Sequence, residues 1–179
     1  MAAHLNQHLI TKEGDSDPSC WLELGQLLEE HHLVAWSASA SDRNRFGESL
    51  ASHLAAMSDT EVCEFSGSQI TDIFSFCNQF ERAIGNDRVR RSIDVSGGVI
   101  DALRASLDND RHIKRRYFIW KDAHVLLKTD PRLFGRLVDT FTGVAAETEY
   151  ASEDLLVIQR AVFIGGPSLD MYAEDAKGQ

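Results

Sequence analysis

Residues 117–124, with the sequence Tyr-Phe-Ile-Trp-Lys-Asp-Ala-His, decide the fold class of this chain. The first four side chains are bulky and apolar without interruption, which is typical of a strand buried on both faces of a sheet. Such a strand requires helices over both faces, because each face must be shielded from water. The polar residues that follow predict that the chain leaves the core at Lys121.

Short apolar runs alternate with longer stretches of helical spacing on either side of this strand. The short runs are 33–36, 61–65 and 155–164, and the first half of the last fits a helix equally well. Helical spacing extends over 18–30, 46–57, 70–84 and 99–107, and again after Pro131 as a wide stripe of Leu133, Phe134, Leu137, Val138 and Phe141. This alternation predicts an α/β fold, a three-layer sandwich with a mainly parallel sheet.

A length of 179 residues fits one domain. We expect a flexible N-terminal tail over residues 1–16 and a single α/β domain over residues 17–179. The N-terminal residues lack the apolar core of a secretory signal, and no apolar run reaches the ~18 residues of a membrane span. The cysteines number three without a close pair, which is typical of reduced, buried thiols. These features predict a cytoplasmic protein with no membrane partner.

The formal net charge of −10 makes nucleic acid an unfavourable partner, because phosphate binding requires a positive surface. Other proteins are the expected partners, and the sequence leaves the oligomeric state open. No metal site is predicted: His31 and His32 are adjacent, so on an extended chain their side chains point apart. His124 has no nucleophile motif to pair with and is expected at the edge of the core, bonded to backbone. We expect the glycines at 165 and 166 to form a turn after a strand.

The segment from Ser37 to Asn44 lies where a phosphate-binding loop would join a strand to a helix. Such a loop needs glycines so that backbone N–H groups reach the phosphates, a lysine for the β- and γ-phosphates, and a hydroxyl for magnesium. On that spacing Ser37 and Asp42 stand at the glycine positions, Arg43 at the lysine and Asn44 at the hydroxyl. The match is one of position and not of residue type.

The residues 121–124, Lys-Asp-Ala-His, resemble the Asp-Glu-Ala-His signature that follows an apolar strand in many P-loop ATPases. Over residues 31–168 the order of elements resembles the ASCE group of P-loop NTPases, which includes AAA+ and RecA-like domains. The resemblance implies a strand order of 2-3-4-1, counted from the strand at 33–36, with a fifth strand absent or replaced. It also implies that Lys121 replaces the acid that holds magnesium and that Asp122 replaces the acid that polarises water. On this mapping Asp122 or Asp42 is the acid nearest to Lys121.

The sequence therefore predicts a degenerate, non-catalytic NTPase-like domain that acts as a protein-binding or regulatory module. No residue is expected to be catalytic, and ATP is not expected as a cofactor. Two alternatives stay open: a weakly active or nucleotide-binding P-loop ATPase with altered motifs, and an unrelated Rossmann-like domain, because any doubly wound sheet contains strand–loop–helix units.

Overall fold

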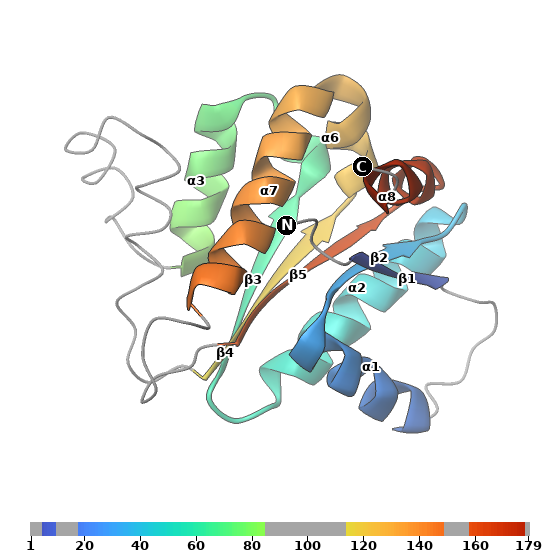
Figure 1. Ribbon diagram of the computed structural model, residues 1–179, viewed down its shortest axis with the longest axis vertical. Coiled ribbons are helices and arrows are strands. Elements are labelled where there is room, and N and C mark those ends of the chain that lie inside the picture. The colour runs from blue at the N-terminus through green and yellow to red at the C-terminus, as the bar shows by residue number, and fades with distance from the viewer. Residues whose placement is uncertain (1–4, 10–17, 85–113, 149–157, 178–179) are drawn as a thin grey trace.

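The computed structural model describes residues 5–9, 18–84, 114–148 and 158–177. Its centre is a five-stranded sheet in the order β1-β2-β5-β4-β3, and all neighbouring strands run parallel (Figure 1). The strands are β1 (Leu5–Leu9), β2 (His32–Trp36), β3 (Thr60–Ser66), β4 (Arg115–Lys121) and β5 (Ile158–Gly165). The α/β class and the parallel sheet are therefore confirmed.

The predicted strand order is confirmed for four strands. Read from the opposite edge, the sheet is β3-β4-β5-β2-β1, which contains the expected 2-3-4-1 order. The fifth strand comes from a region where none was expected: residues 5–9 form β1, which pairs with β2 from Leu5 beside His32 to Leu9 beside Trp36. The expectation of a flexible tail is therefore wrong at residues 5–9, because these residues gain backbone pairing along the exposed edge of β2.

Helices cover both faces of the sheet, as the three-layer prediction requires (Figure 1). One face carries α1 (Pro18–Glu30) and α2 (Ala40–Ala55). The other face carries α3 (Ile73–Ile84), α6 (Ala123–Thr129), α7 (Pro131–Thr148) and α8 (Ser168–Lys177). A short 3-10 turn, η1 (Gly67–Gln69), follows β3. Two of these helices, α6 and α8, were not predicted.

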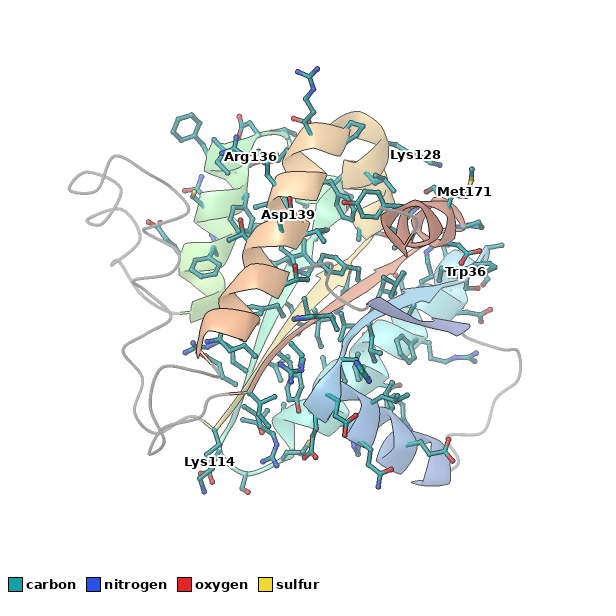
Figure 2. All side chains as sticks on the ribbon, in the orientation of Figure 1. Trp36, Lys114, Lys128, Arg136, Asp139 and Met171 are labelled. Carbon is teal, nitrogen blue, oxygen red and sulfur yellow. The ribbon has the colours of Figure 1, made fainter. Side chains whose placement is uncertain are left out.

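The larger part of the core is an aromatic cluster between the sheet and helices α3 and α7. The predicted stripe on α7 is confirmed, since Leu133, Phe134, Leu137, Val138 and Phe141 are all buried. By contrast, Arg136 and Asp139 lie on the side of α7 directed away from the sheet (Figure 2). The smaller core, on the other face, joins Leu24 and Leu28 of α1 to Leu50 and Leu54 of α2 through aliphatic side chains of the sheet.

Several other expectations from the sequence can be compared with the structure. β5 begins at Ile158, so the strand alternative holds from that residue onward. Cys63 and Cys77 are free and buried, as expected, and burial raises the pKa of the Cys63 thiol to about 12. The predicted helix at 99–107 lies outside the described residues. In the described ranges no helix is both long and apolar enough to cross a membrane.

Candidate functional site

The candidate site is the edge of the sheet where the carboxyl ends of the strands meet. Parallel sheets bind ligands at this edge, because the connections to the following helices gather there. Among the described residues, four connections lie at this edge: those from β2 to α2, β3 to η1, β4 to α6 and β5 to α8. The predicted site residues divide between the first connection and the third.

The connection from β2 to α2 is shorter than expected. β2 ends at Trp36 and α2 begins at Ala40, so the loop comprises only residues 37–39. Ser39 is the N-cap, and its side chain accepts a hydrogen bond from the Asp42 backbone N–H at 3.2 Å. Because this cap starts the helix early, the segment from Ser37 to Asn44, which was aligned with a phosphate-binding loop, is helical from residue 40 onward. The positions of Asp42, Arg43 and Asn44 lie in the first turns of α2.

The Arg43 guanidinium folds back onto this loop. Its Nη1 donates to the Ser37 carbonyl oxygen at 2.7 Å and to the Ala38 carbonyl oxygen at 3.2 Å. The cation therefore lies against the turn that would have to bend around a phosphate. Asp42 forms an ion pair with Arg45 at 3.2 Å, and Asn44 is exposed.

Lys121 does not pair with either acid that the mapping suggested. Its Nζ lies 2.6 Å from Glu64 Oε2 on the neighbouring strand β3, so the expectation of Asp122 or Asp42 is wrong. The side chain of Lys121 also crosses α2 at Gly47, where an added Cβ would lie 3.3 Å from Lys121 Cε. The reason for the error is geometric: the lysine side chain leaves β4 on the α2 face, where Glu64 projects from the next strand.

Asp122 forms the sharp turn between β4 and α6. Its backbone has φ 51° and ψ 32°, a left-handed conformation that aspartate tolerates better than most residues. One carboxylate oxygen is 3.5 Å from the Ser68 hydroxyl, and that hydroxyl lies 2.8 Å from the Ser66 hydroxyl. The Asp122 side chain thus makes its contact towards η1, on the β3 side of β4.

His124 lies over the end of β5. A Cβ added to Gly166 would lie 3.0 Å from its ring, so glycine is what permits this close approach. Burial lowers the pKa of His124, with a further contribution from the positive charge of Arg43. Nδ1 is buried and has no hydrogen-bond partner in the part of the chain that the structure describes, which differs from the expected backbone bond. Burial and the charge of Arg43 therefore both disfavour the protonated form of this ring.

The two groups of predicted site residues make separate sets of polar contacts. The residues from Ser37 to Arg43 bond to one another and to Arg45, whereas Lys121 and Asp122 contact the β3 side of the sheet. β5 lies between β2 and β4 and separates the two groups. Sequence reasoning missed Glu64, because only the register of β3 against β4 brings it near Lys121. It also missed Ser68, which the turn η1 after β3 brings to Asp122. Among the described residues no cluster of three or more His, Cys, Asp or Glu side chains could hold a metal ion.

Two glycine variants test how tightly this edge is packed. A Cβ at Gly67 would lie 2.5 Å from the backbone oxygen of Asp122, so Gly67→Ala must displace one of the two turns. We expect it to lower the free energy of unfolding by about 1–3 kcal/mol. Gly25 of α1 has nothing within 4 Å of its added Cβ, so Gly25→Ala should instead raise stability by about 0.5–1 kcal/mol. Urea denaturation of both variants checks the pair, and equal effects would contradict the packing described for the Gly67 turn.

Comparison of this chain with protein-family models, with curated proteins and with solved structures finds no match.

Proposed function

We propose that this chain is an NTPase-like domain without catalytic activity, which acts by binding other proteins. The proposal has two parts. First, the residues of this chain at the positions that bind phosphate and magnesium in P-loop NTPases do not bind them here. Second, the α/β scaffold serves to bind partner proteins.

The observation that carries the first part is the conformation of residues 37–43. A phosphate-binding loop surrounds its ligand with backbone N–H groups, which requires several residues between strand and helix. Here helix α2 begins after a loop of three residues, 37–39, and Arg43 donates to the carbonyl oxygens of that loop. The loop presents its carbonyls to a cation of its own chain, so a phosphate would have to displace internal hydrogen bonds to enter.

The magnesium position supports the same conclusion. In the family a carboxylate stands there and holds the ion through water, whereas here the ammonium of Lys121 is paired with Glu64. A positive charge at this place repels a divalent cation. Phosphoryl transfer relies on electrostatic stabilisation by the metal and by positioned cations, so losing the metal ligand removes a main part of the machinery.

The second part is supported by the charge and shape of the molecule. The net charge of −10 favours partners other than nucleic acid. An open groove of about 430 Å³ lies beside the Lys121–Glu64 pair, with both polar and apolar side chains in its lining, including Val62, Phe65 and Gln79. A shallow, mixed surface of this kind suits a segment of another protein better than an enclosed small-molecule pocket would.

Phosphate release measured with Mg-ATP and Mg-GTP tests the proposal. Wild type and the charge-restoring variant Lys121→Asp should both show no steady release, because the short loop at 37–39 excludes the phosphates even when an acid is restored. Lys128→Asp on the exposed part of α6 is the matched control for the charge change. Steady phosphate release by wild type that Asp122→Ala abolishes would overturn the proposal.

A further inference from the structure

β3 is the outer strand of the sheet at the edge opposite to β1. It pairs with β4 along its whole length, from Thr60 beside Arg115 to Ser66 beside Lys121. In the ranges that the structure describes, no other strand pairs with it. An edge strand presents a row of backbone N–H and C=O groups that another extended chain can bind.

The side chain of Gln79 on α3 shows which residues of β3 face outward. Its Oε1 accepts from the Ser66 backbone N–H at 2.9 Å, and its Nε2 donates to the Ser66 carbonyl oxygen at 3.2 Å. A carboxamide offers the same donor and acceptor as a peptide group, so Gln79 takes the place of a neighbouring strand at Ser66. Backbone groups alternate between the two edges of a strand. The N–H and C=O groups of Glu64 and Val62 therefore face the same outer edge.

The groove described above follows this outer edge. Val62, Glu64 and Ser66 of β3 line it, together with Arg82 and Ala83 of α3. Its size is within the range of protein binding pockets, and it is widely open to solvent. Gln79 closes it at Ser66, so an added chain would pair with β3 beside Val62 and Glu64 and end at Gln79.

The charges in the groove favour an acidic occupant. Arg82 is exposed and makes no ion pair with any described residue, and Lys121 adds a second cation, against the single carboxylate of Glu64. This local excess of positive charge stands out on a chain with a net charge of −10. The same net charge disfavours a second copy of this chain as the occupant, because two copies repel each other.

We propose that the outer edge of β3 binds an extended segment of a partner protein that carries an acidic side chain, and that this segment adds a sixth strand to the sheet. Backbone hydrogen bonds to Val62 and Glu64 supply the affinity, and Arg82 selects the acidic side chain. This inference rests on the proposed role as a protein-binding module and identifies the surface that performs it.

The test uses a fluorescein-labelled, seven-residue peptide in which valine alternates with glutamate, titrated with the full chain and followed by fluorescence anisotropy. Val62→Pro removes one outward N–H and leaves the bonds to β4 in place, because proline is tolerated on the open side of an edge strand. Val62→Ala is the matched control, since it shortens the same side chain and keeps the N–H. Binding should weaken by about tenfold in the proline variant relative to the alanine variant, the value of one backbone hydrogen bond.

A charge swap provides a readout that does not depend on how the proline variant folds. Arg82→Glu should weaken binding of the glutamate peptide by about fivefold or more and should favour a peptide with lysine in place of glutamate. Arg132→Glu, on the exposed face of α7, should change neither the affinity for the glutamate peptide nor the preference between the two peptides. The inference is overturned if the glutamate peptide shows no saturable binding at millimolar protein, or if the two arginine variants have equal effects. It is also overturned if the free chain forms a dimer that Val62→Pro dissociates. If neither the peptide nor Mg-ATP binds, this inference fails but the proposed lack of nucleotide chemistry stands. If Mg-ATP binds, the proposed function is contradicted, whatever the peptide does.

Discussion

Replacing Phe141 by alanine is expected to lower the free energy of unfolding by about 3–5 kcal/mol, the range for a phenylalanine removed from a packed core. Phe141 is 2 % exposed on α7. Its ring lies within 6.2 Å, centroid to centroid, of five other aromatic rings, those of Phe65, Phe76, Phe80, Phe118 and Trp120. These rings come from two strands and α3, so the cavity left by the variant opens where three elements meet and cannot close by moving one of them.

Phe74→Ala is the matched control for this variant. Phe74 belongs to α3 but is 73 % exposed, so truncating it should change stability by no more than about 0.5 kcal/mol. Guanidinium denaturation of the two variants measures the difference. Similar midpoints for wild type and Phe141→Ala would show that the aromatic cluster does not hold α7 on the sheet.

Lowering the pH from 6.5 to 4 is expected to remove about 3 kcal/mol of stability through His32 alone. Burial, reinforced by the charge of Arg160, lowers the pKa of His32 from 6.5 to about 4. Its Nδ1 accepts a hydrogen bond from the Ala161 backbone N–H at 2.9 Å, which requires the neutral ring. In this pH range the unfolded chain binds a proton at His32 that the folded chain does not. The stability that neutral His32 contributes is therefore fully present above pH 6.5 and is lost as the pH falls through 4.

The variant His32→Asn keeps an acceptor close to the position of Nδ1 and cannot take up a proton. Its free energy of unfolding should therefore fall less steeply than that of wild type between pH 6.5 and 4. Wild type, measured over the same pH range, is the reference, because it keeps the titratable ring at position 32 and the neighbouring His31. Equal slopes for wild type and His32→Asn would contradict the role assigned to His32.

The sequence predicts most of the sheet because its signals are local. The run Tyr117 to Trp120 and the stripe from Leu133 to Phe141 each specify burial within one element, and both are confirmed. The resemblance of residues 31–168 to the ASCE group in their order of elements adds the strand order, which the structure confirms for β2 to β5. β1 could not be found this way, because residues 5–9 are strand only through their pairing with β2.

The site was harder to predict because its contacts join residues far apart in the chain. The pair of Lys121 with Glu64 follows from the register of two strands, and nothing near either residue in the sequence indicates it. The early start of α2 depends on the cap at Ser39, which is one of five consecutive serines and alanines at 37–41 that fit a loop and a helix start equally well. Sequence spacing indicated that residues 37–44 and 121–122 follow the carboxyl ends of two strands, but it did not indicate what each side chain contacts there.

The central claim is that this edge does not receive a nucleotide, and isothermal titration calorimetry of the wild-type chain with Mg-ATP tests it most directly. The account predicts no saturable heat at millimolar nucleotide. A thermal-shift measurement under the same conditions should agree, since a ligand at a hundred times its Kd would add about 2.7 kcal/mol of stability. Saturable binding at micromolar Mg-ATP that Arg43→Ala or Lys121→Ala weakens would show that residues 37–44 and 121–122 form a working nucleotide site, and would contradict the account.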